Sequence, residues 1–215
     1  MSKQVRIDFV SDISCPWCVI GLKSIEQALD RVKDTVGAEL HFQPFELNPN
    51  MAPGGQDIGE HLAEKYGASE EQGATTREMI RARGAELGFT FNMEARSRIY
   101  NTFDAHRLLH WAGLQGKGPA LQMALFEAYF TKGESPGDHN VLERTALEVG
   151  LDSAEAARIL STDAYAADVR EREQYYQRAG INSVPAIIIN ERHLISGGQP
   201  PEVFEQALRQ VAAQS

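Results

Sequence analysis

The sequence has little cysteine, little positive charge and no long apolar run. Each of these shortages excludes some classes of function. The chain has 215 residues with only two cysteines, and a chain of this length buries a full core without disulfides or metals. No stretch approaches the roughly 18 to 20 apolar residues of a membrane span, so no membrane partner is expected. The 21 Lys and Arg face 30 Asp and Glu, which gives a net charge of −9. Without a basic block, no nucleic-acid partner is expected.

The first residues also lack the pattern of a secretion signal. Residues 1–6 run directly into a strand-like segment at 5–10, with no basic region followed by an apolar run and a small-residue cleavage site. We therefore expect a cytoplasmic protein. That compartment keeps thiols reduced, which bears on the two cysteines.

The cysteines, Cys15 and Cys18, form a C-x-x-C pair that is compatible with zinc binding, a structural disulfide or redox chemistry. Structural zinc needs four ligands, but there is no second pair, and of the six histidines only His106 and His110 share helical spacing, so no metal is expected. A disulfide closing so small a ring removes little chain entropy, about 2 kcal/mol, and a reducing cytoplasm opens it. The redox interpretation is favoured.

The surroundings of the pair support redox chemistry. A strand precedes Cys15, and an amphipathic helix follows it, with one apolar face made of Val19, Leu22, Ile25, Ala28, Leu29 and Val32. Cys15 therefore lies at a helix N-terminus, where free N–H groups and the helix dipole favour a thiolate. Pro16 in the first turn gives up no needed hydrogen bond. We predict that Cys15 is the nucleophile and that Cys18, one turn later, is the resolving thiol.

Strands and helices are expected in the order β-α-β, a helical stretch, then β-β-α. An alternating segment at 38–45 predicts the second strand, and residues 186–189 and 193–196 predict two more before a final helix from Pro200 and Pro201. The helical stretch includes a short strand-like segment at 88–91, with Asp138 and Ser153 as N-caps. Its helices are expected at 57–66, 69–87, 98–114, 117–132, 138–149, 153–160 and 162–179.

This order predicts an α/β fold interrupted by an all-helical insertion. A Pro- and Gly-rich segment at 48–55 marks the first boundary. Residues 1–55 and 162–215 are expected to form one domain, and residues 56–161 the inserted helical domain.

The sequence resembles a known family at several separated motifs. Cys15-Pro16-Trp17-Cys18 after a strand, together with Ser183-Val184-Pro185-Ala186 before the third strand, resembles the thioredoxin fold. The helical insertion resembles the DsbA superfamily. The segments 11–18, 101–107 and 196–199 look closest to its FrnE-like branch, and the resemblance covers essentially the whole chain.

The resemblance implies that the Val184–Pro185 bond is cis and that Pro185 faces the cysteines. The backbone of Val184 would then pair with an extended substrate as an added strand does. Trp17, between the cysteines, is expected to be an exposed recognition residue, and Pro16 is expected to bind substrate beside it. The strongly oxidising periplasmic members of the family carry His at the Trp17 position, so a less oxidising couple is expected here.

Further site candidates lie outside these motifs. Asn101 and His106 are expected on one helix, in the stretch that resembles the family's substrate-side helix, as substrate-binding residues. Asp8 is a candidate proton acceptor for Cys18, with Glu46 a weaker contender. Asp12 is expected to be mainly structural, in a turn or cap.

The resulting prediction is a thiol–disulfide oxidoreductase of DsbA/FrnE type, a protein disulfide oxidoreductase or isomerase. A mixed disulfide on Cys15 would be resolved by Cys18, with polypeptides or small thiols and disulfides as substrates. No cofactor is required, and glutathione stays open as a co-substrate. Monomer and homodimer are both compatible with the charge.

Two alternatives remain open. The first is a glutathione-dependent isomerase or transferase, because the sequence also resembles 2-hydroxychromene-2-carboxylate isomerase and the kappa-class glutathione transferases. Those relatives typically carry Ser where Cys15 stands and lack the second cysteine. The second is a polypeptide-binding, chaperone-like module that uses a cleft between the domains.

Overall fold

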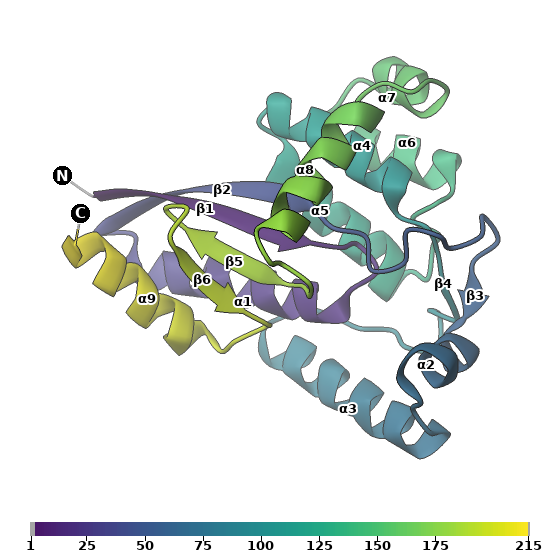
Figure 1. The fold of residues 1–215 in the computed structure, drawn as a ribbon, viewed down its shortest axis with the longest axis horizontal. Helices are drawn as coiled ribbons and strands as arrows, with labels where there is room; N and C mark the ends of the chain where they lie inside the picture. The colour runs from purple at the N-terminus through teal and green to yellow at the C-terminus, as the bar shows by residue number, and fades with distance from the viewer. Residues whose placement is uncertain (1–2, 215) are drawn as a thin grey trace.

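A four-stranded sheet lies at the centre of the computed structural model, which describes residues 3–214 (Figure 1). The strand order is β2-β1-β5-β6, with β1 and β2 parallel and the other neighbours antiparallel. The strands are β1 (Lys3–Ser11), β2 (Val36–Pro44), β5 (Ala186–Ile189) and β6 (His193–Ser196). The two ends of the sequence therefore share one sheet, as the element order predicts.

Two helices cover one face of this sheet, α1 (Pro16–Val32) and α9 (Pro201–Gln214), and they pack against each other. The predicted apolar face of α1 is confirmed, because Val19, Leu22, Ile25, Ala28 and Val32 are all buried. Its last turn carries Leu29, which is partly buried against the same core. Burial of this face fixes how α1 lies on the sheet, and so where its first residue points.

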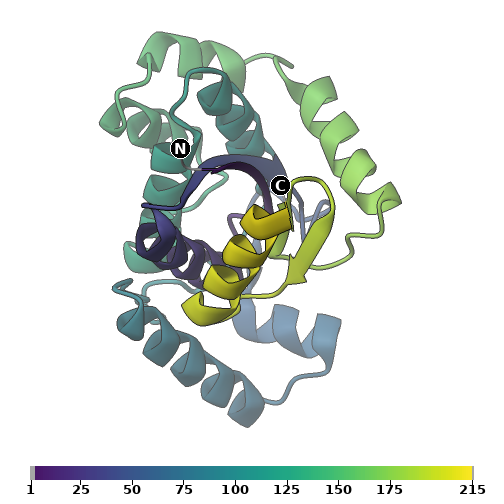
Figure 2. The ribbon, with the colours of Figure 1, turned by 90° about the vertical axis from the view of Figure 1, so that its left-hand side faces the viewer.

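The intervening segment is mainly helical and lies on both sides of the sheet. On the far side from α1, three helices contact β2, namely α4 (Phe103–Leu114), α5 (Gly118–Phe126) and α8 (Ala166–Arg178). Beyond them lie α6 (His139–Glu148) and α7 (Ser153–Leu160), while α2 (Ile58–Tyr66) and α3 (Glu70–Glu86) lie on the α1 side (Figure 2). One π-helical turn, Glu127–Thr131, continues α5.

The prediction of a helix over 98–114 is wrong for its first residues. Its first residues form the strand β4 (Arg98–Ile99), which pairs with β3 (Gln56–Asp57), and the helix begins only at Phe103. The side chain of Asn101 accepts the N–H of Phe103 at 2.9 Å. A two-residue pairing between distant segments leaves no periodic signal, so local pattern extends the helix across it.

Two smaller predictions also need correction, while one is confirmed. Residues 88–91 form no strand; they fold back as a turn in which the N–H of Phe89 bonds to the carbonyl of Gly84 at 2.8 Å. The N-cap of α7 is Asp152, whose side chain accepts the N–H of Glu155, and not Ser153. Asp138 caps α6 as predicted.

The division into domains stays a prediction: α8, assigned to the sheet domain, packs on both β2 and α4.

The packing of α3 gives a paired stability test. A Cβ added at Gly84 would lie 2.4 Å from the Phe91 ring and 3.0 Å from the Phe89 carbonyl. Gly84→Ala should therefore lower the free energy of unfolding by about 1–3 kcal/mol. Gly73→Ala on the same helix is the control, because its Cβ would meet only the flexible end of Arg77, at 3.4 Å. That variant should be neutral or more stable by up to about 1 kcal/mol. Urea unfolding measures both, and equal effects would contradict the packing argument.

Candidate active site

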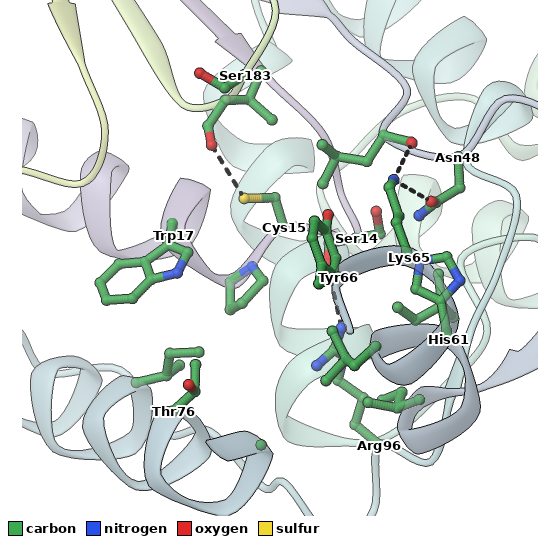
Figure 3. Close-up of a pocket in the computed structure, with 18 of the residues that line it drawn as sticks. Ser14, Cys15, Trp17, Asn48, His61, Lys65, Tyr66, Thr76, Arg96 and Ser183 are labelled. Carbon is green, nitrogen blue, oxygen red and sulfur yellow. Dashed lines mark hydrogen bonds between the residues drawn. The ribbon is translucent and has the colours of Figure 1, made fainter. Parts of the chain in front are cut away.

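Cys15 lies where β1 passes into α1, at the bottom of a cleft (Figure 3). It is the N-cap residue of α1, with extended backbone, and Pro16 takes the first helical position. Its thiol donates to the carbonyl of Val184 at 3.6 Å, and only 4% of the residue is exposed. Cys18 is fully buried one turn later, and its N–H bonds to the Cys15 carbonyl at 3.1 Å. One sulfur thus faces the cleft, and the other lies behind it.

The segment directly beside Cys15 is the loop that precedes β5. The Val184–Pro185 peptide bond is cis, as the family resemblance implies. Pro185 lies so close to α1 that a Cβ added at Gly21 would be 3.0 Å from its ring. Gly198 approaches the carbonyl of Trp17 equally closely, at 3.0 Å from its own added Cβ. The glycines at these positions let the loop lie directly against the helix that carries the cysteines.

The cleft has a volume of about 570 Å³ and separates the cysteine loop from α2 and α3. Four predicted site residues besides the cysteines lie in this region: Pro16, Trp17 and Val184 line the cleft, and Pro185, in the loop before β5, packs against α1. Trp17 differs from its prediction of exposure, because it is half-buried and packs against the core. The position of Trp17 at a helix end suggests exposure, but it gives no sign that α3 lies on the other side of the cleft.

Asp12 is a fully buried carboxylate that joins three segments behind the cysteines. It accepts the N–H and hydroxyl of Ser14 at 3.1 and 2.8 Å, the N–H of Leu47 at 2.7 Å and the hydroxyl of Thr102 at 2.8 Å. Burial raises the pKa of this carboxyl, but His106 and the hydrogen-bond donors outweigh burial and hold that pKa below its usual value. Asp12 is therefore an ionised structural link.

His106 is the counter-charge of Asp12. Its Nε2 lies 3.6 Å from Asp12 Oδ1, an ion-pair distance rather than a hydrogen bond, and both side chains are buried. Burial lowers the pKa of His106, but Asp12, with smaller contributions from Glu173 and Glu46, raises it above the usual value. The structure therefore holds an imidazolium–carboxylate pair behind the cysteines.

The two residues predicted to bind substrate from α4 do not line the cleft. His106 faces Asp12 and a separate cavity of about 30 Å³. Asn101 lies before the helix, and its side-chain amide donates to Glu46 at 3.4 Å and to the carbonyl of Pro49 at 3.2 Å. The segment that contains Asn101 and His106 lies behind the cysteines. The cleft wall that faces Cys15 is formed by α2 and α3 instead.

Asp8, the predicted proton acceptor, is held elsewhere. Its carboxylate accepts two hydrogen bonds from Arg6 at 2.9 and 2.7 Å and one from Gln43 at 2.7 Å. The pKa of Cys18 is raised well above its usual value by burial and then by Cys15. Asp12 affects this pKa in two opposing ways: a backbone hydrogen bond lowers it, and the charge of the carboxylate raises it.

Three cations on the cleft wall were missed by sequence reasoning: Lys65 from α2, Arg77 from α3 and Arg96 from the following loop. Arg96 donates to the carbonyl of Ser14 at 3.3 Å, and its guanidinium lies 4.8 Å from the centre of the Tyr129 ring. No local pattern marks these residues, because they face the cysteines only through tertiary packing.

Two further kinds of site bear on residues 3–214, a metal centre and a membrane-spanning helix. Within that range, no three His, Cys, Asp or Glu side chains are grouped so that they could hold a metal ion. No helix of the described chain combines the length and apolar character needed to cross a membrane.

Comparison with known proteins identifies the family. Residues 6–209 match the model of the DSBA-like thioredoxin domain. The crystal structure of probable DsbA oxidoreductase SCO1869 from Streptomyces coelicolor is 35% identical, with a TM-score of 0.91 over 98% of this chain and 91% of that one. Uncharacterized protein YwbO of Bacillus subtilis (strain 168) is 30% identical over 205 residues, 95% of this chain and 96% of its own length.

A third comparison reports on the fold alone. The structure of 2-hydroxychromene-2-carboxylate isomerase has a TM-score of 0.74 at 14% identity, over 97% of each chain. The relation to that isomerase expected from the sequence is therefore present at the level of fold.

The buried pair predicts an alkaline loss of stability. Because the pKa of His106 is raised on folding, its contribution is fully present below about pH 6.5 and is lost as pH rises through the folded value. At pH 6, His106→Gln should lower the free energy of unfolding by about 3 kcal/mol, since one partner of a buried pair is removed. From pH 6 to 9, urea unfolding should show wild-type stability falling toward that of the variant.

His110→Gln is the control, one turn further along α4. Burial lowers the pKa of His110, so its contribution has the opposite sign and is lost as pH falls. This variant should keep the alkaline loss of the wild type. Equal alkaline slopes in wild type and His106→Gln would contradict the assigned pair.

Proposed function

Because the chain belongs to the family of DSBA-like thioredoxin domains, we propose that it is a thiol–disulfide oxidoreductase that works through Cys15 and Cys18. The observation that carries the proposal is the unequal placement of the two sulfurs. Cys15 Sγ lies in the cleft at the start of α1, beside the carbonyl of Val184, and Cys18 is buried behind it. That is the arrangement of an attacking and a resolving thiol.

In the reducing direction, the Cys15 thiolate attacks one sulfur of a substrate disulfide. The substrate S–S bond breaks, a Cys15–substrate disulfide forms, and the first substrate thiolate leaves and takes up a proton. Cys18 loses its proton and attacks Cys15 Sγ, which releases the second substrate thiol and forms the Cys15–Cys18 disulfide. Two electrons pass to the substrate. The reverse sequence oxidises a substrate dithiol.

The buried groups shape the second step. The raised pKa of Cys18 keeps it a thiol until the mixed disulfide has formed, so that Cys15 is the sulfur that meets the substrate. A backbone hydrogen bond with Asp12 favours the Cys18 thiolate, whereas the negative charge of Asp12 opposes proton loss, and His106 offsets part of that charge. In this proposal Asp12 and His106, rather than Asp8, influence resolution.

The substrate backbone has an available acceptor beside the sulfur. The Val184 carbonyl accepts the Cys15 thiol in the reduced protein, and it loses that donor once Cys15 is joined to a substrate. The carbonyl can then accept a substrate N–H, as an added strand does. Pro16 and Trp17 line the adjoining wall.

The proposal includes a cellular setting. We place the reaction in the cytoplasm, with polypeptide or small disulfides as substrates. Glutathione is the co-substrate that would recycle the cysteine pair there, since that compartment keeps thiols reduced.

Trapping of the intermediate tests the mechanism. Cys18→Ser should accumulate a Cys15–glutathione disulfide when it is incubated with oxidised glutathione, because no thiol remains to resolve it. Cys15→Ser should form none, since Cys18 is fully buried. Wild type equilibrated in graded glutathione buffers should form the Cys15–Cys18 disulfide reversibly. A potential near about −270 mV would indicate a reductase, and one near about −120 mV an oxidant. Mass spectrometry after thiol alkylation measures every species.

The same experiment separates the alternatives. A wild-type protein that forms no intramolecular disulfide at any glutathione ratio, while a glutathione-dependent activity survives in Cys18→Ser, would instead support an isomerase or transferase. Binding of unfolded polypeptide that persists with both cysteines replaced by Ala, without any redox activity, would support a chaperone-like module.

A further inference from the structure

The cleft wall that faces Cys15 carries three cations that form no ion pair with a carboxylate of the described chain. Among the described residues, Lys65, Arg77 and Arg96 have no carboxylate within ion-pair distance. Glu46 is the single acidic residue of the described lining, and Arg170 already pairs with it. The chain as a whole has a net charge of −9, whereas the lining of this cleft carries more positive than negative charge.

Two of these cations are fixed in place. Lys65 Nζ donates to the carbonyl of Leu47 and to Asn48 Oδ1, both at 2.7 Å (Figure 3). An ammonium has three donors, so one remains for a ligand. Arg96 is held by its bond to Ser14, the residue before Cys15. Arg77 has no hydrogen-bond or ion-pair partner within the described chain, and its side chain reaches the cleft from α3.

The neighbouring histidine shows the effect of this charge. His61 also lines the cleft, and its pKa is lowered by burial and then by the charge of Lys65. The charge of Lys65 is therefore felt inside the cleft, although Glu64 opposes it at His61. Opposite charge on a ligand would be attracted within a partly desolvated space.

The shape of the cleft limits the size of that ligand. Its volume of about 570 Å³ is that of a small-molecule site. Cys15 is only 4% exposed, so a sulfur must be carried on a slender group to reach it. The exposed disulfide of a folded protein, surrounded by its own surface, fits these limits poorly.

We propose that the substrate of this site is a low-molecular-weight disulfide that carries carboxylates, held by Lys65 and Arg77 while Cys15 attacks its sulfur. The inference rests on the proposed function and adds the substrate class. The bonds that break and form, and the two electrons transferred, are those of the mixed-disulfide sequence given above.

Single-turnover reactions of the reduced protein test the proposal without a recycling reductant. Three disulfide probes differ in charge: anionic glutathione disulfide, neutral bis(2-hydroxyethyl) disulfide and cationic cystamine. Their intrinsic reactivities differ, so the measurement is the ratio of variant to wild-type rate for each probe, followed by quenched alkylation and mass spectrometry. The variants are Lys65→Gln, Arg77→Gln and the double variant. Lys132→Gln is the matched control, because Lys132 is exposed and lies outside the cleft lining.

The double variant should react about tenfold more slowly with glutathione disulfide and faster with cystamine, while Lys132→Gln matches wild type with all three. Added salt should slow only the anionic probe in wild type. Equal slowing of all three probes would mean that the cations act on the Cys15 thiolate alone, and it would overturn the proposal. Unchanged ratios would overturn it as well. If no probe forms a mixed disulfide on Cys15, the proposed function itself fails.

Discussion

The buried carboxylate of Asp12 is the interaction on which the geometry of the site depends. It joins the loop before Cys15, the segment after β2 and the start of α4 through hydrogen bonds to Ser14, Leu47 and Thr102. An ionised group in a water-free interior is costly unless it is paired and hydrogen-bonded, and His106 completes the set. The position of Cys15 is thereby fixed relative to the sheet and to the helical segment at once.

Close packing on the other side of the cysteines is equally constrained. Because Gly21 and Gly198 have no side chains, the loop with Pro185 and the segment that leads into α9 can lie directly against α1. The Val184 carbonyl is thereby held beside the Cys15 thiol. Reactive sulfur and backbone acceptor are therefore placed by rigid elements, and α2 and α3 close the opposite wall.

The charges around the pair are divided between two regions. Behind the cysteines, the buried Asp12 carboxylate pairs with His106, and the buried Glu173 pairs with Arg170. In front of them, Lys65 and Arg77 face the cleft, and neither has a carboxylate partner among the described residues. The first region bears on the proton of Cys18, and the second bears on what approaches Cys15. A charge change in one region should thus affect a different step from a charge change in the other.

Sequence pattern alone predicts the strands of the sheet, the apolar face of α1 and the strand-to-helix position of Cys15. These features depend on periodicity and on neighbours along the chain, which local pattern records. The family resemblance added the cis Val184–Pro185 bond opposite the cysteines. The β3–β4 pairing escaped prediction because its two short segments lie far apart in sequence.

Which charged side chains meet depends instead on tertiary packing. Asp8 and Asp12 look alike along the chain, yet Arg6 and Gln43 hold the first, while the second bears on Cys18. His106 was expected in the substrate site but is buried against Asp12, because the way α4 packs on β2 decides which way its side chains point. Lys65 reaches the cleft for the same physical reason, because the packing of a helix decides which of its side chains point into a cleft.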